Sequence, residues 1–134
     1  MKIQTSLTNI KSIIEDLSEF TDTPGHGVTR FSYGEQDKKA RKYIIGLCED
    51  LGLSVRTDAV GNIFARLEGK DPMLSPIITG SHIDSVKQGG KFDGIVGCVC
   101  GLEAVRVLVE NNYCSLRPIE LATARQTHEK IPKP

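Results

Sequence analysis

A histidine and two aspartates near the middle of the chain have the residue types and the spacing of a metal site. His82 and Asp84 stand two residues apart, so at the end of a strand their side chains project to the same side. Asp84 can then accept a hydrogen bond from one imidazole nitrogen of His82 while the other nitrogen binds a metal. Asp93 follows in a glycine-rich loop that can fold back toward the strand end, where its two oxygens can bridge two metal ions.

Residue types and spacing alone leave a second interpretation open. A His-x-Asp sequence occurs by chance in many proteins, and Asp93, which precedes an apolar helical segment, can equally serve as the N-cap of that helix. His26, between two glycines, and His128, in an irregular C-terminal segment, have less support as ligands. The four cysteines include no C-x-x-C pair, so we expect small buried thiols rather than a zinc site.

Three segments show helical periodicity. Apolar residues at steps of three and four predict an amphipathic helix over roughly the first twenty positions. Ser32 and Glu35 have the spacing of a capping box for a second helix, which the stop signal at Gly52 ends. The third segment is strongly apolar and carries Gly97 and Gly101 one turn apart, so this helix can pack closely on a sheet.

The segments between these helices change to a period of two residues. Residues 53–59 and 63–67 alternate in polarity, and the Gly-Asn step between them predicts a hairpin turn. A short buried strand is expected from Ile77 to His82, and another strand over residues 119–123. The order α, α, β, β, β, α, β therefore predicts an α/β fold with helices packed on a mixed β-sheet.

Composition excludes several classes of protein. The chain has 134 residues, enough for one domain, and its 17 Lys and Arg residues equal its 17 Asp and Glu residues. Without a positive field, neither nucleic acid nor an anionic membrane is an expected partner. The most apolar stretch, residues 95–109, contains two charged residues and is too short to span a bilayer, and charges also interrupt any N-terminal signal. We therefore expect a cytoplasmic protein.

The segment from Thr79 to Gly97, TGSHIDSVKQGGKFDGIVG, resembles the signature of one branch of the peptidase M20 family. That branch hydrolyses N-carbamoyl-L-amino acids, allantoate and related ureido compounds. Residues 27–30 and 58–63 resemble its early loop and its hairpin, and the likeness extends from about residue 5 to about residue 121. The Gly-Gly-x-x-Asp-Gly block is specific, because it separates this branch from most M20 peptidases.

The resemblance implies a role for each of the three candidate residues. His82 corresponds to a ligand of one metal, Asp93 to the carboxylate that bridges both, and Asp84 to the residue that orients His82. The family uses two divalent metal ions, zinc or manganese, to activate a water that attacks an amide or ureido carbonyl. The implied partner is therefore a small-molecule ureido or amide substrate, and full-length relatives are homodimers.

The sequence departs from the family pattern near its C-terminal end. The family has two adjacent glutamates after the last strand, a general base and a metal ligand, but residues 125–130 contain no such pair. Glu129 is displaced from the pattern, so it receives no role. Later histidine ligands and the lid and dimerisation domain are also absent. We therefore expect a partial M20-type catalytic domain over residues 1–123, with exposed strand edges, and an irregular tail over residues 124–134.

Three functional hypotheses follow from this incomplete pattern. The first is a hydrolase of carbon–nitrogen bonds other than peptide bonds, which as this fragment binds divalent metal weakly and lacks activity alone. The second is a non-catalytic binding or regulatory remnant, or the product of a pseudogene. The third is a segment that pairs with a separately encoded remainder of the enzyme. The residues that select among ureido substrates lie mainly in the part that this sequence lacks.

Overall fold

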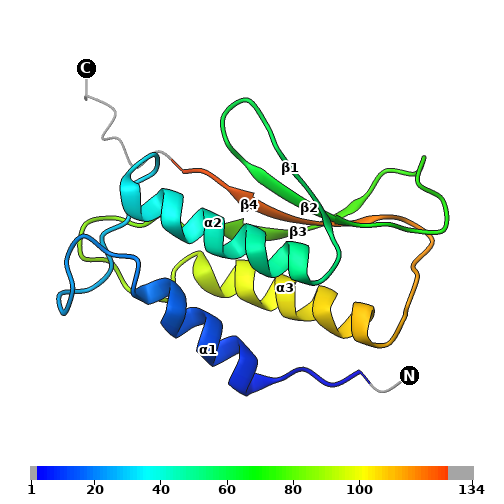
Figure 1. The fold of residues 1–134 in the computed structure, drawn as a ribbon, viewed down its shortest axis with the longest axis horizontal. Helices are drawn as coiled ribbons and strands as arrows, with labels where there is room; N and C mark the ends of the chain where they lie inside the picture. Colours follow the sequence, from blue (N-terminus) through cyan, green and yellow to red (C-terminus); the bar gives the residue numbers. More distant parts are fainter. Residues whose placement is uncertain (1–2, 127–134) are drawn as a thin grey trace.

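Helices α2 and α3 cover one face of a four-stranded sheet and α1 packs against α3 in the computed structural model of the chain, which describes residues 3–126 (Figure 1). The elements are α1 (Leu7–Ser18), α2 (Glu35–Asp50), β1 (Ser54–Thr57), β2 (Ile63–Leu67), β3 (Ile77–His82), α3 (Ile95–Glu110) and β4 (Ile119–Ala124). Their order and the mixed sheet confirm the predicted α/β class.

The strands lie in the order β1-β2-β4-β3, and only the last pair is parallel. β1 and β2 form the predicted hairpin, and β2 then pairs antiparallel with β4. Alternation along the strands turns Ala65 and Leu121 toward the helices, where both are buried. Glu120 points to the opposite face, where its carboxylate accepts hydrogen bonds from Arg66 at 3.3 Å and Arg56 at 3.2 Å.

α3 packs closely on β3 and β4 because two of its residues are glycines, as the sequence predicted. A Cβ atom on Gly97 would lie 2.7 Å from the Cβ of Ser81. On Gly101 it would lie 2.8 Å from a methyl group of Leu121. Such separations are shorter than van der Waals contact, so these two positions set how near the helix axis comes to the sheet.

α1 is shorter than the periodicity predicted. It begins at Leu7, so Ile3 precedes the helix, and its side chain is 67% exposed. Two hydrogen bonds fix this start. The Ser6 hydroxyl accepts one from the Asn9 N–H at 3.1 Å, and the Glu103 carboxylate of α3 accepts one from the Ser6 N–H at 2.6 Å. Capping therefore overrides the apolar pattern, which alone cannot locate a helix end.

Glu103 is a buried carboxylate that joins α1 to α3. Besides the Ser6 N–H, it accepts hydrogen bonds from the Asn9 side-chain amide at 2.9 Å and from Arg106 at 2.6 and 2.7 Å. The hydrogen bonds from Arg106 are the largest cause that lowers the pKa of Glu103 to about 2, against the opposing effect of burial. The charged form is thus the stable one in the folded chain.

The predicted capping box of α2 is wrong. The N-cap is Gly34, which has no side chain to cap with, and the Ser32 hydroxyl binds elsewhere. Asp37, in the first turn, instead accepts a hydrogen bond from the Tyr33 N–H at 3.0 Å. At the other end Gly52 has a φ of 78°, which confirms the predicted stop signal.

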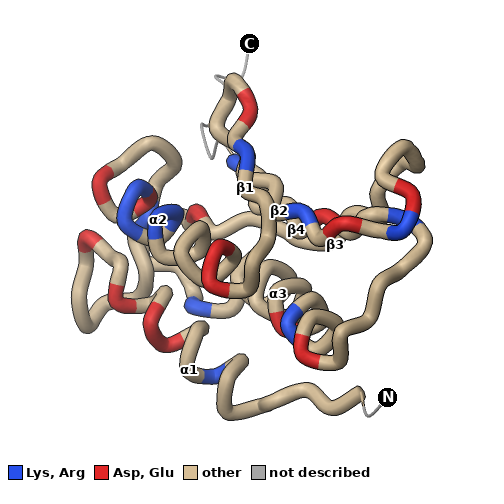
Figure 2. The backbone as a smooth tube through the Cα atoms, turned by 45° about the vertical axis from the view of Figure 1, so that its right-hand side comes forward, with Lys and Arg blue, Asp and Glu red and all other residues tan. Residues whose placement is uncertain are grey.

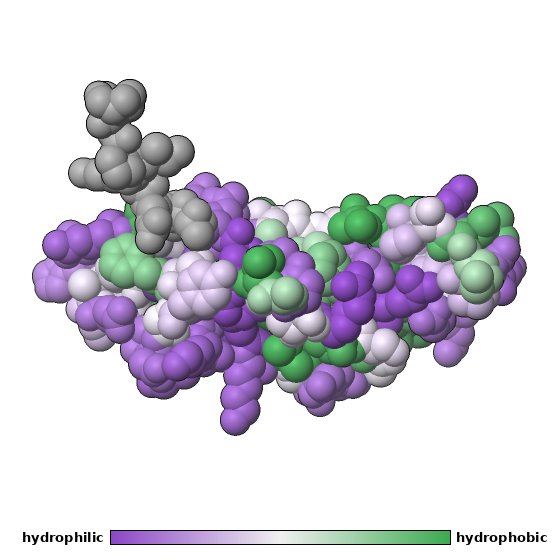
Figure 3. Space-filling model, turned by 90° about the horizontal axis from the view of Figure 1, so that it is seen from above, coloured by the Kyte–Doolittle hydropathy of each residue, from purple (hydrophilic) through white to green (hydrophobic). Residues whose placement is uncertain are grey.

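The strand expected to be buried from Ile77 is exposed at its start. Ile77 and Ile78 are 55% and 58% exposed, because β3 lies at the edge of the sheet and has β4 as its sole neighbour among the described strands. The sheet face opposite the helices carries apolar side chains interspersed with polar ones (Figure 3). The exposed strand edge that the sequence predicted is therefore present.

Two of the four cysteines depart from the expected burial. Cys48 and Cys98 are buried, whereas Cys100 and Cys114 are exposed. The two-residue step on α3 turns Cys98 toward the core and Cys100 away from it. Burial raises the pKa of Cys48 to about 12 and also raises that of Cys98, so both thiols stay protonated near neutral pH.

Charged residues are distributed over helices, strands and loops (Figure 2). Basic and acidic side chains form ion pairs with one another, as between Lys91 and Glu15 at 2.5 Å. Among residues 3–126, no helix combines the length and the apolar character that crossing a lipid bilayer requires.

Replacing Gly97 with alanine is expected to destabilise the fold, because the new methyl group collides with Ser81. The expected loss is roughly 1–3 kcal/mol of unfolding free energy, the usual effect of overpacking. Gly46→Ala on α2 is the matched control, since a Cβ atom there meets nothing within 4 Å. It should raise stability by about 0.5–1 kcal/mol through helix propensity. Urea unfolding of both variants tests the pair, and equal effects would contradict the close contact.

Glu103→Gln is expected to lower the unfolding free energy at neutral pH by roughly 1–3 kcal/mol, because a charged acceptor is lost from a buried network. The pKa of Glu103 is lowered in the folded chain, so its contribution is complete above about pH 4.5 and declines as the pH falls toward 2. Urea unfolding at several pH values should show the variant approaching the wild type over that range. Glu68→Gln, in an exposed pair with Arg66, serves as a control that should change little.

Candidate functional site

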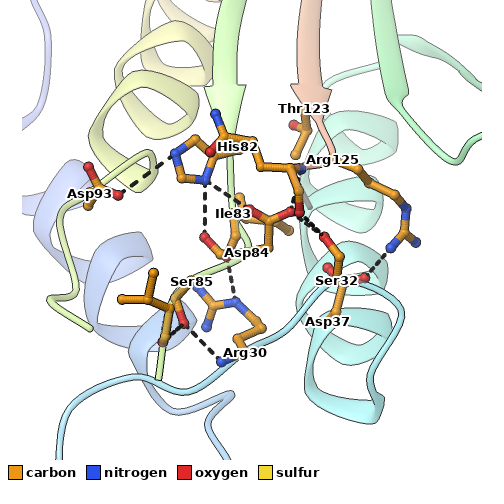
Figure 4. Close-up of polar contacts among 12 residues, drawn as sticks. Arg30, Ser32, Asp37, His82, Ile83, Asp84, Ser85, Asp93, Thr123 and Arg125 are labelled. Carbon is orange, nitrogen blue, oxygen red and sulfur yellow. Dashed lines mark hydrogen bonds and ion pairs between the residues drawn. The ribbon is translucent and has the colours of Figure 1, made fainter. Parts of the chain in front are cut away.

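His82 is the last residue of β3, and Asp84 contacts the Nδ1 side of its imidazole ring (Figure 4). Its Nδ1 atom is 3.0 Å from the backbone oxygen of Asp84 and 3.0 Å from the Oδ1 atom of the same residue. Both oxygens can only accept, so the neutral ring carries its hydrogen on Nδ1 and its lone pair on Nε2. This is the arrangement that the two-residue spacing of His82 and Asp84 predicted.

Asp93 faces the other side of the same ring. Its Oδ2 atom lies 3.9 Å from Nε2 of His82, and its side chain is 87% exposed. It does not cap α3, because the N-cap residue is Gly94. Gly94 has a φ of 71°, and a Cβ atom on it would lie 2.4 Å from the imidazole, so only glycine allows the loop to pass so near His82.

The second carboxylate oxygen of Asp84 is bound by groups that the sequence analysis did not identify. The Ser32 hydroxyl donates to Oδ2 of Asp84, and the Gln126 N–H donates to the same atom at 2.7 Å. Asp84 is only 2% exposed, and the charge of a buried carboxylate requires such donors. Ser32 and Asp84 are 52 positions apart, so no local pattern pairs them.

Arg30 holds the loop that contains Ser32 against the site. Its guanidinium anchors the loop by donating to backbone carbonyls, to Ile83 at 2.7 Å, Leu17 at 2.7 Å and Phe20 at 2.8 Å. Burial is the main cause that lowers the pKa of Arg30, opposed by the nearby carboxylates of Asp37 and Asp84.

The strand predicted to end at Thr123 continues to Ala124, and the next two residues are also fixed in the fold. Arg125 forms an ion pair with buried Asp37 at 2.6 Å and lies over the ring of Tyr33, 4.0 Å from its centroid. Its N–H also donates to the side chain of Asn62 at 2.8 Å. Residues 127–134, and with them His128 and Glu129, lie outside the described residues.

The donors at His82 and Asp93 fit a divalent cation. An imidazole nitrogen and a carboxylate oxygen are ligands that zinc and manganese accept. Since each bond is about 2.0–2.2 Å long, a separation of 3.9 Å between Nε2 and Oδ2 allows one ion to contact both atoms. Within residues 3–126, however, no group of three or more His, Cys, Asp and Glu side chains is placed to hold a metal. Among the described residues, His82 and Asp93 are thus two candidate donors.

Searches against known proteins find relatives by sequence, although no family model matches the chain. The N-carbamoyl-L-amino-acid amidohydrolase of Paenarthrobacter aurescens is 49% identical over 111 residues, which are 83% of this chain and 27% of that protein. The ureidoglycolate hydrolase of Oryza sativa subsp. japonica is 45% identical over 108 residues, which are 81% of this chain and 22% of that protein. The chain therefore spans about a quarter of the length of these curated relatives.

Solved structures share the fold. The crystal structure of a hydantoinase/carbamoylase family amidase from Burkholderia multivorans superposes with a TM-score of 0.86 at 33% sequence identity. The match covers 90% of this chain and 29% of that one. The shared fold thus extends over nine tenths of this chain.

Proposed function

Since the chain is homologous to the hydantoinase/carbamoylase family amidases and shares their fold, we propose that it forms part of the active site of a metal-dependent amidohydrolase. The resemblance seen in the sequence to this branch is confirmed by these relatives, which are named as hydrolases of ureido and carbamoyl compounds. The proposed reaction is hydrolysis of a carbon–nitrogen bond in a linear amide or ureido compound. The single observation that carries the proposal is the geometry around His82.

That geometry prepares His82 to bind a cation before any cation arrives. Asp84 holds the hydrogen on Nδ1, and this leaves the Nε2 lone pair directed toward the side where Asp93 lies. We assign His82 and Asp93 as ligands of a divalent ion, zinc or manganese, and Asp84 as the residue that orients His82. When bound, such an ion supplies Lewis acidity toward a carbonyl oxygen and toward water.

Two donors are fewer than a catalytic metal site normally requires. Catalytic zinc usually has three protein ligands and one open position. The family's pair of glutamates does not appear in residues 125–130, and the chain spans only about a quarter of its relatives' length. We infer that this chain binds a divalent ion weakly and does not hydrolyse ureido compounds by itself.

A non-catalytic binding or regulatory module is the second candidate function. The observation that favours it is Arg125, which follows β4 where the family resemblance leads toward a glutamate pair. Its guanidinium is held by Asp37 and Tyr33, so this segment contributes a structural contact rather than a carboxylate. Such a module keeps the fold but hydrolyses no ureido compound, whichever divalent metal is supplied.

Calorimetric titration with zinc and with manganese tests the assignment of His82 and Asp93. We expect saturable binding to the wild-type chain and a loss of affinity of at least about 10-fold in His82→Ala and in Asp93→Ala, because each removes a direct ligand. Asp50→Ala, an exposed aspartate on α2, is the matched control and should bind as the wild type does. Equal binding by all four proteins would reject the site.

Hydrolysis assays with an N-carbamoyl-L-amino acid, in the presence of zinc or manganese, test the inferred inactivity. The purified chain should release no carbamoyl group above the uncatalysed background, since it supplies two metal donors and lacks the glutamate pair. Turnover that disappears in His82→Ala would instead show that the chain is a complete catalyst, and the inference would fail.

A further inference from the structure

We propose that Ser32 is a positioning residue for His82 and acts through Asp84. The inference rests on the proposed function in one respect, because it assumes that the direction of the His82 Nε2 lone pair matters for binding a cation. The geometry itself consists of a chain of contacts from the Ser32 hydroxyl to Oδ2 of Asp84, and from Oδ1 of Asp84 to Nδ1 of His82 (Figure 4).

The carboxylate of Asp84 is held at both of its oxygens. Oδ1 accepts from the imidazole of His82 at 3.0 Å, while Oδ2 accepts from the Ser32 hydroxyl and from the Gln126 N–H. A carboxylate fixed at one oxygen can still rotate about its Cβ–Cγ bond. Donors on the opposite oxygen restrict that rotation, so they determine where Oδ1 is presented to the ring.

The single hydrogen of the Ser32 hydroxyl has two acceptors within reach. One is Oδ2 of Asp84, and the other is the backbone oxygen of Gln126 at 2.7 Å. Hydrogen bonds to an ionised acceptor are roughly twice as strong as those between neutral groups. The hydroxyl therefore donates preferentially to the carboxylate, and the Gln126 carbonyl is a second acceptor of the same hydrogen.

The backbone around Ser32 is tied to the segment that carries Asp84. The Arg30 N–H donates to the Ser85 hydroxyl at 2.9 Å, and the Ser85 N–H donates to the Arg30 carbonyl at 2.8 Å. The Arg30 guanidinium adds a bond to the Ile83 carbonyl at 2.7 Å. These bonds lie on both sides of Asp84 and bring Ser32 to it in a defined position.

Loss of the Ser32 hydroxyl removes one donor from Oδ2, which keeps the hydrogen bond from the Gln126 N–H. The carboxylate then gains rotational freedom, and the bond from Oδ1 to Nδ1 of His82 weakens. The neutral imidazole has two tautomers, and hydrogen on Nδ1 is favoured by that bond together with the Asp84 backbone oxygen, which also lies 3.0 Å from Nδ1. Removing the hydroxyl weakens the carboxylate part of this preference and therefore shifts population toward the tautomer with hydrogen on Nε2, which cannot bind a cation there.

The test compares Ser32→Ala with Ser32→Thr, which restores a hydroxyl, in the full chain. Long-range proton–nitrogen NMR of the metal-free, nitrogen-15-labelled protein reports the tautomer, and His82→Asn identifies the signals of His82. We expect the Nδ1–H pattern in the wild type and in Ser32→Thr, and a larger Nε2–H population in Ser32→Ala. Zinc affinity, measured by competition with a chelating indicator, should fall roughly 5- to 10-fold in Ser32→Ala alone.

Ser18→Ala is the matched control, because it removes a hydroxyl that donates to a backbone carbonyl on α1, away from the site. It should leave the tautomer and the zinc affinity unchanged. If Ser32→Ala does not fold, Ser32→Cys replaces it, since a thiol has similar size and is a weak donor. A Ser32 variant that melts at a lower temperature but keeps the wild-type tautomer would overturn the proposal.

Failure of this proposal and failure of the proposed function give different results. A wild-type chain that binds no zinc would contradict the metal-site assignment, yet the tautomer comparison in the metal-free protein would still decide the role of Ser32. Conversely, wild-type and Ser32→Ala proteins with equal zinc affinity and equal tautomer populations would reject the positioning role while leaving the metal site intact.

Discussion

The buried carboxylate of Asp84 is the interaction on which the arrangement of the site depends. Asp84 is only 2% exposed, so its carboxylate needs hydrogen-bond donors from the protein. These donors come from β3, from the loop before α2 and from the segment after β4. Three parts of the chain that are far apart in sequence thus meet at one group. The same requirement that stabilises the carboxylate also fixes the imidazole of His82.

Close packing of α3 on the sheet places the other half of the site. Gly97 and Gly101 let the helix approach β3 and β4, and Gly94, just before the helix, passes against the ring of His82. The glycine-rich loop then brings Asp93 to 3.9 Å from Nε2. Helix–sheet packing therefore sets where Asp93 lies relative to His82.

The location of the site agrees with the topology of the sheet. β3 and β4 form the parallel pair, and His82 and Ala124 lie opposite one another at its carboxyl end. In open α/β sheets ligands bind beyond the carboxyl ends of parallel strands, where loops converge. Among residues 3–126, no strand pairs with the outer edge of β3 and no helix covers the sheet face opposite α2 and α3. The chain spans about a quarter of its relatives' length.

The sequence by itself determined the order of the elements, the hairpin, the glycine contacts of α3 and the pairing of His82 with Asp84, because periodicity, turn residues and short spacings are local signals. Only the tertiary structure decided that Ser32 binds Asp84 rather than capping α2, that Glu103 sets the start of α1, and that Ile77 lies exposed at a sheet edge. These outcomes depend on partners 52 and 97 positions away, or on which strands are neighbours. A hydroxyl or a carboxylate can satisfy several donors and acceptors, and the folded chain selects among them by distance.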